Sequence, residues 1–151
     1  MRKTYCASKK NYKSFFIFFC FFAYLLYTFS VAYSVPCNSD MANMVLEAED
    51  IIHGNFFLKD WILTGITFFT TDLIFFEIGT AIFGVSNLAY VFSIWCMWLA
   101  LILVGIAFFF DLCPKEKRWY LLPLFLAICA FPCKEFIWHS RVHTGSAVFA
   151  L

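Results

Sequence analysis

Two aspartates, Asp40 and Asp72, lie where a carboxylate could do chemistry at a membrane surface. Asp40 stands five residues after an uncharged apolar run, 14–35, and opens a polar stretch that leads back to further apolar sequence. Asp72 follows two threonines farther along the chain. A carboxylate in such a place can act as a general base toward a substrate hydroxyl. For both residues the structural alternative is a helix N-cap, a position that aspartate favours.

A second group of polar residues, near the C-terminus, has the chemistry to bind phosphate. Arg141 carries a planar guanidinium that can bind two phosphate oxygens at once. His139 and His143 are spaced as i and i+4. We predict that these three residues bind substrate; the alternative is contact with lipid headgroups. Because no Glu-x-x-His or cysteine pattern accompanies the histidines, we predict no metal site and no cofactor, although a requirement for a divalent metal stays open.

The composition of the chain is that of a membrane protein. It is 63% hydrophobic, 23% aromatic and 14% charged, with a mean hydropathy of +0.80. A soluble domain of 151 residues could not bury so much apolar surface. The net charge of +1 argues against a nucleic-acid partner, which needs clustered Lys and Arg. We therefore expect an all-α, polytopic membrane protein with about three transmembrane helices.

Uncharged length divides the chain into membrane and water-exposed segments. We expect a basic tail (1–13), a transmembrane helix (14–35), a long external loop (36–87), a second transmembrane helix (88–110), a loop (111–119), a short transmembrane helix (120–133) and an external segment (134–151). A cleaved signal peptide is the rival interpretation of 14–35, since Ala32-Tyr33-Ser34 resembles a cleavage site. We favour an uncleaved anchor because the apolar run is longer than a signal peptide requires.

The basic residues predict the orientation. Five precede the first apolar run and three follow the second, within 115–118. Loops rich in Lys and Arg stay in the cytoplasm, so we expect a cytoplasmic N-terminus and an external loop 36–87. That loop agrees, because it carries seven acids and the single basic residue Lys59.

The external loop contains the pattern of two helices. Apolar residues recur at helical spacing over 41–52 while the acids keep mostly off that face, which predicts an amphipathic helix lying on the membrane or packed on the spans. We expect Ser39 or Asp40 to cap its start and Gly54 to end it. A second helix is expected from about 70–72 to 81.

Two cysteines could share the external compartment. Cys37 and Cys133 flank expected spans on the outer side, which allows a disulfide without requiring one.

The order of these features resembles the N-terminal part of integral-membrane glycosyltransferases of the GT-C fold class, which includes protein mannosyltransferases and lipid A aminoarabinose transferases. The residues that carry the resemblance lie within about 10–112. They are Asn38-Ser39-Asp40, the stretch Ala48-Glu49-Asp50-Ile51-Ile52-His53-Gly54-Asn55, Trp61 and Thr70-Thr71-Asp72.

The resemblance implies a reaction and its participants. Members of the class transfer a sugar from a polyprenyl phosphate, and an acid in the first external loop is the expected base or acceptor-positioning residue. Asp40 matches that position, with Asp72 as the second candidate. The implied partners are a lipid-linked sugar donor and membrane lipids, the implied acceptor belongs to the cell envelope, and the implied location is the bacterial inner membrane.

The length of the chain departs from that family. Its members have many more spans, so we expect these 151 residues to be inactive alone. They would form the N-terminal portion of an enzyme and act with the rest of a longer protein or with another membrane subunit; the apolar stretch 145–151 favours truncation. The alternative is a small non-catalytic membrane protein, either an accessory subunit or the remnant of a decayed enzyme gene.

Overall fold

The chain folds into helices. A computed structural model describes residues 2–62 and 71–139, and every regular element within these ranges is α-helical. The helices are α1 (Arg2–Ser34), α2 (Ser39–Ile52), α3 (Leu73–Phe83), α4 (Asn87–Leu112) and α5 (Arg118–His139). The expected all-α class is thus confirmed for the described part of the chain.

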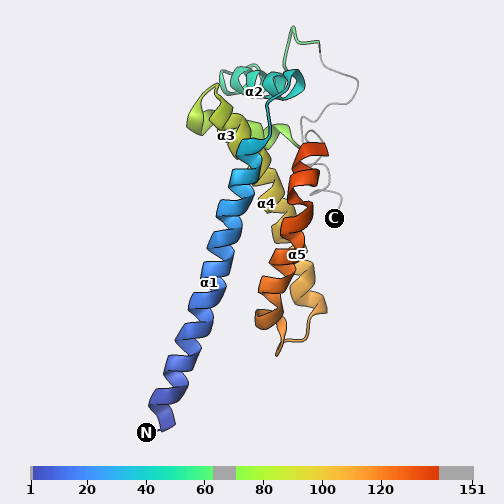
Figure 1. The fold of residues 1–151 in the computed structure, drawn as a ribbon. Helices are drawn as coiled ribbons and strands as arrows, with labels where there is room; N and C mark the ends of the chain where they lie inside the picture. Colours follow the sequence, from blue (N-terminus) through green and yellow to red (C-terminus); the bar gives the residue numbers. More distant parts are fainter. Residues whose placement is uncertain (1, 63–70, 140–151) are drawn as a thin grey trace.

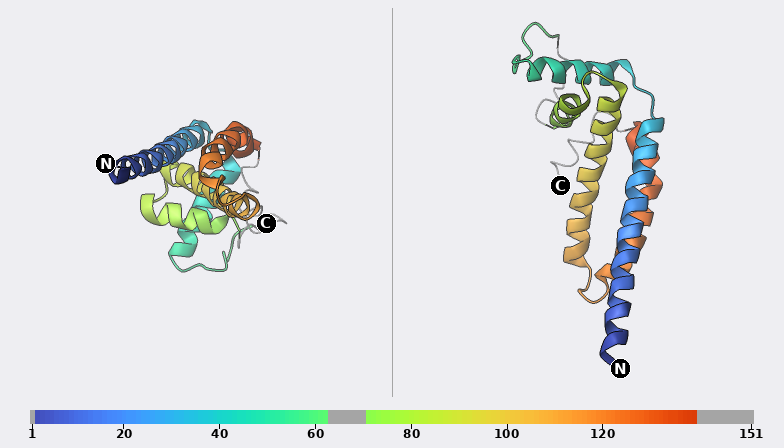
Figure 2. Two further views of the ribbon diagram at one scale, coloured as in Figure 1. Left: turned by 90° about the horizontal axis from the view of Figure 1, so that it is seen from below. Right: turned by 90° about the vertical axis from the view of Figure 1, so that its left-hand side faces the viewer.

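The five helices form two regions. The long helices α1, α4 and α5 run lengthwise beside one another, and α2 and α3 lie across one end of them (Figure 1). A side view shows α2 outermost, with α3 beneath it and beside the end of α4 (Figure 2). We call the three long helices the stem. The cap is α2, α3 and residues 53–62.

Two stem helices are long and apolar enough to cross a membrane. They are the Ser14–Ser34 part of α1 and all of α4, Asn87–Leu112, close to the predicted spans 14–35 and 88–110. The apolar part of α5 is shorter, Arg118–Phe131. The helix itself extends beyond the predicted 120–133 at both ends and passes through Pro123 and Pro132 without a break. Prolines are tolerated inside membrane helices because neighbouring groups can satisfy the freed backbone carbonyl.

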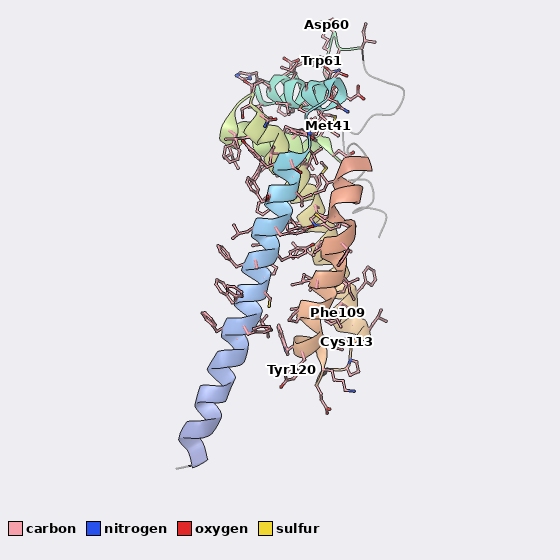
Figure 3. All side chains as sticks on the ribbon, viewed as in Figure 1. Met41, Asp60, Trp61, Phe109, Cys113 and Tyr120 are labelled. Carbon is pink, nitrogen blue, oxygen red and sulfur yellow. The ribbon has the colours of Figure 1, made fainter. Side chains whose placement is uncertain are left out.

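The two ends of the stem differ in what they carry. The N-terminus lies at the same end as the connection between α4 and α5, and the cap lies at the other (Figure 1). The labelled residues show the same division, with Phe109, Cys113 and Tyr120 at one end and Asp60 and Trp61 at the other (Figure 3). Both groups of basic residues therefore belong to the end opposite the cap.

Aromatic donors of α4 bind α1 and the residues that follow it. Trp98 Nε1 donates to Tyr24 Oη (3.0 Å), Trp95 Nε1 to Thr28 Oγ1 (3.1 Å) and Tyr90 Oη to the Pro36 carbonyl (3.4 Å). Their spacing along α4 matches the facing positions on α1, so the bonds fix both the rotation and the height of α1. A buried indole or phenol needs such a partner for its polar atom.

In α1 and α4 the buried core is concentrated at the cap end of the stem, whereas α5 also buries Leu122 and Leu126 farther from the cap. The buried residues of α4 all lie between Ala89 and Ile102. In α1 the buried residues that the structure describes are Tyr24, Thr28, Val31 and Ala32. Val35 is buried just beyond the end of the helix. Farther from the cap, α1 exposes Phe15, Phe16, Phe18, Phe19 and Phe22.

Candidate functional site

Asp40 lies in the first turn of α2 with its side chain exposed. The residue that caps this helix is Asn38, whose Oδ1 accepts a hydrogen bond from Met41 N at 2.9 Å. The prediction that Ser39 or Asp40 is the cap was therefore wrong. Asn38 has the extended backbone of an N-cap, φ −105° and ψ 177°, so the helix begins one residue earlier and Asp40 is already inside it.

Asp72 lies at the start of α3 and is completely buried. It occupies the N-cap position, but its backbone is already helical, φ −92° and ψ −38°, and its side chain makes no capping hydrogen bond to α3. The structural role considered for this residue, a side-chain cap, is thus not the one it performs. A carboxyl removed from water in this way must be held by the protein around it.

The two aspartates lie on helices that pack together, but their carboxylates do not share an exposed surface. α2 packs on α3 at the cap, so Asp40 and Asp72 belong to the same region of the molecule. Asp40 faces solvent and Asp72 is enclosed. Of the two, only Asp40 is placed to meet a substrate hydroxyl that arrives from water.

The contact between α3 and α4 is unusually close and fixes the position of α3. A Cβ built on Gly79 would lie 2.7 Å from the Ala89 carbonyl oxygen and closer still to Ser93 Oγ. The Ser93 hydroxyl lies 2.7 Å from the Ala89 carbonyl in its own helix and 3.0 Å from the Phe75 carbonyl of α3. The absence of a side chain at Gly79 is therefore what lets α3 rest directly on the backbone of α4.

Residues 50–61 form a hydrogen-bonded turn that the sequence did not predict. Asp50 Oδ2 accepts from Asn55 Nδ2 (2.6 Å) and from Trp61 Nε1 (2.8 Å). Asn55 also bonds both backbone groups of Lys59: its Oδ1 accepts from the amide (2.8 Å), and its Nδ2 donates to the carbonyl (3.1 Å). We call this set, Asp50, Asn55, Lys59 and Trp61, the Asp50 clasp.

The Asp50 clasp holds a turn that the chain would not adopt readily. Leu58 and Asp60 have positive φ values, 47° and 73°, and the Leu58 side chain is nonetheless buried. A left-handed conformation costs a residue such as leucine on the order of 1–2 kcal/mol. Hydrogen bonds from Asn55, and then from Trp61, lower the pKa of the Asp50 carboxyl, since they favour its charged form.

Two further acids of the cap have carboxyls with altered acidity. Burial raises the pKa of Glu47 on α2 and that of Glu77 on α3, because removal from water disfavours the charged form. The sequence did not single out Glu47, because a charged residue at the edge of an amphipathic helix is normally solvated.

The predicted phosphate-binding residues are only partly within the described structure. His139 is the last residue of α5, which ends at the cap end of the stem. Arg141 and His143 lie outside the described residues, as does Thr70. Cys37 and Cys133 are both free thiols, the first exposed and the second buried. Among the described residues, no group of three His, Cys, Asp or Glu side chains is arranged to hold a metal ion.

Comparison of the chain with protein-family models, with curated proteins and with solved structures found no match. The geometry of the cap and stem is therefore the basis for assigning a function.

Proposed function

We propose that this chain is the N-terminal portion of a membrane glycosyltransferase that transfers a sugar from a polyprenyl-phosphate donor to a cell-envelope acceptor. In this proposal the stem is a polytopic bundle in a bacterial inner membrane, with the N-terminus in the cytoplasm and the cap outside. The end that carries the basic residues then faces the cytoplasm, in keeping with the preference of Lys and Arg for that side.

The observation that carries the proposal is that neither candidate aspartate caps a helix with its side chain. Asn38 performs that task for α2, and the Asp72 side chain makes no capping bond to α3. The commonest structural reason for an aspartate at these positions is thereby removed. Asp40 is left as an exposed carboxylate at the external end of the bundle, where an acceptor hydroxyl and a lipid-linked donor would meet.

The proposed reaction uses Asp40 as the general base. Its carboxylate accepts the proton of the acceptor hydroxyl, whose oxygen forms the new bond to the anomeric carbon of the sugar. The bond from that carbon to the phosphate oxygen breaks, and polyprenyl phosphate leaves with the electron pair. Asp72 acts as a positioning residue at the buried start of α3. Arg141, His139 and His143 are proposed to bind the donor phosphate.

The test compares two aspartates of the same external region. Membranes that express the gene in its natural setting are supplied with a synthetic polyprenyl-phosphate sugar, and transfer to the envelope fraction is measured. Asp40→Asn should lower transfer by about a hundredfold or more, the usual contribution of a general base. The matched control Asp60→Asn changes an exposed aspartate of the cap and should leave transfer unchanged. Equal transfer in both variants would contradict the assignment of Asp40.

A non-catalytic accessory protein is the second candidate, and one observation favours it. Asp40 lies in the first turn of α2, where a negative charge stabilises a helix by about 0.3–1 kcal/mol through the helix dipole. That role needs no substrate. It predicts that Asp40→Asn slightly weakens α2 and leaves transfer intact, so the same pair of variants separates the two candidates.

A further inference from the structure

The surface of α3 that faces away from the protein carries a stripe of isoleucines. Ile74, Ile78 and Ile82 follow one another at intervals of four residues and are 45%, 49% and 59% exposed. The opposite side of the same helix buries Leu73, Phe76, Gly79 and Thr80 against α2 and α4. A short helix that leaves three isoleucines uncovered needs an apolar partner on that side.

The height of α3 along the stem identifies the partner. Gly79 rests on Ala89 and Ser93 of α4, and the Phe83 and Phe92 rings are in contact with centroids 5.3 Å apart. At 1.5 Å per residue, Ser93 and Ala89 stand roughly 27 and 33 Å from Asp111, the first charged residue of α4. The hydrocarbon core of a bilayer is about 30 Å thick. With Asp111 at one border of that core, α3 lies at the other border.

The stripe also continues into the surface of a candidate span. Residues 78–110, from the middle of α3 to the last turn of α4, contain no charged side chain. Exposed apolar residues lead from the stripe onto α4 through Phe83, Val85 and Leu88. The turn between the two helices therefore places no charged side chain between the stripe and the surface that would contact lipid.

The helix α2 differs in this respect. It lies on the outer side of α3 (Figure 2), and its apolar face, with Met41, Met44 and Ala48, is already buried. Its acids lie away from that face. The stripe of α3 thus lies on a face of the helix that neither α2 nor α4 covers.

We propose that the isoleucine stripe of α3 binds the acyl chains of the outer leaflet, and that α2 rests on α3 and not on lipid. The cap then has a lipid-bound lower helix and a water-exposed upper helix. This arrangement rests on the membrane orientation proposed above and does not depend on the transfer reaction.

The experiment places a photo-crosslinking amino acid, p-benzoylphenylalanine, at single positions of the full chain in nanodiscs of phosphatidylethanolamine and phosphatidylglycerol. Ile78 and, separately, Ile74 report on the stripe. Leu103, exposed in the middle of α4, gives the yield expected of a lipid-facing position. Leu46 is the matched control, because it is an α2 leucine that is 45% exposed, like Ile74, but is proposed to face water. Adducts are identified by mass spectrometry.

Lipid adducts at Ile78 and Ile74 should approach the yield at Leu103, and the yield at Leu46 should be about tenfold lower. Three results would overturn the proposal. The first is crosslinking of the stripe to protein, which would assign it to a second copy or another subunit. The second is the absence of any lipid adduct at both isoleucines. The third is a lipid yield at Leu46 equal to that at Ile78.

Discussion

The cap and the stem are stabilised in different ways. In the cap, α2 and α3 bury apolar faces against each other and against the end of α4, and a polar clasp closes the turn that follows α2. In the stem, α1 leaves the compact core near the cap and exposes large aromatic side chains farther down, while the lower parts of α4 and α5 stay in contact through the stacked rings of Phe109 and Phe125. The cap resembles the interior of a small water-soluble protein, whereas the lower stem leaves its apolar surface to lipid or to further helices.

This difference predicts where a substitution has a large effect. Close packing leaves no room for an added side chain, so the α3–α4 contact should be the most sensitive. Hydrogen bonds in the cap compete with water, and those in the stem compete, in the membrane setting proposed above, with other partners within the bilayer. Each kind of hydrogen bond should contribute less to the free energy of unfolding than the packing between α3 and α4 does.

The largest effect is expected for Gly79→Leu. The Ala89 carbonyl oxygen would lie 2.7 Å from the new Cβ, and as a backbone atom it can move only with α4. Overpacking of this kind costs about 3 kcal/mol. The thermal unfolding of the purified chain, followed by circular dichroism in detergent, should shift to lower temperature, and amide exchange across α3 should accelerate.

The control for that variant is Ala81→Leu, which adds the same side chain to the exposed face of α3. It should change the unfolding temperature little. If both variants behave alike, the contact at Gly79 is not what holds α3 on α4, and the comparison between cap and stem loses its strongest support.

A smaller effect is expected for Asn55→Ala, which removes the central side chain of the Asp50 clasp. The loss of its bonds to Asp50 and Lys59 should make local opening of this turn easier, because three hydrogen bonds that hold it are removed. Hydrogen exchange of residues 53–62 should accelerate by about tenfold, with the stem unaffected. Asn43→Ala, at an exposed position of α2, provides the control. Unchanged exchange over 53–62 would mean that the backbone alone maintains this turn.

The hydrogen bonds of the stem should contribute less to stability than those of the Asp50 clasp. A double-mutant cycle with Tyr24→Phe and Trp98→Phe isolates the 3.0 Å hydrogen bond between the two side chains. The coupling should be about 0.6 kcal/mol, the average found inside membranes. The pair Tyr27→Phe and Trp98→Phe should show no coupling, because Tyr27 is exposed. A coupling in the stem as large as the effect of Gly79→Leu would reverse the order proposed for the two regions.

The smallest expected effect is the pH dependence of the Asp50 clasp. The pKa of Asp50 in the folded chain is lower than its usual value of 3.8. The clasp is therefore fully stabilised above about pH 4 and loses that contribution as the pH falls through the folded value. The indole N–H signal of Trp61, assigned by its loss in Trp61→Phe, should shift toward the position of an exposed indole only below about pH 4. A transition above about pH 5 would assign the titration to another group.

The fold could be predicted wherever uncharged length decides it. The long helices α1 and α4 follow from uncharged apolar runs long enough to cross a membrane. The helix α2 follows from the helical spacing of its apolar residues, and α3 follows from the capping residues that precede it. The extent of α5 was underestimated, because the uncharged run that predicts it is shorter than the helix, which begins at Arg118 and continues through Pro123 and Pro132 to His139. A single sequence does not reveal which carbonyls near a proline find other partners.

The site was less predictable because it depends on one-residue differences in backbone geometry. Asn38, Ser39 and Asp40 are all good capping residues, and only the conformation of the linker after α1 selects Asn38. The pairing of Asp50 with Trp61 requires left-handed conformations at Leu58 and Asp60, and neither residue type predicts such a conformation. Gly79 could have drawn attention, since a glycine in the middle of a helix needs a packing reason.

The three aromatic donors of α4 also determine how force passes through the molecule. Tyr90, Trp95 and Trp98 engage α1 and the linker to α2 at successive heights, so a slide of α1 by one helical turn, about 5.4 Å, would break all three bonds together. The helix α1, which includes the N-terminal tail from Arg2 onward, therefore forms one rigid unit with the linker that leads into α2, and α4 holds this unit in place. A pull on the tail would reach the cap as a movement of the whole unit and not as a stretch of the helix.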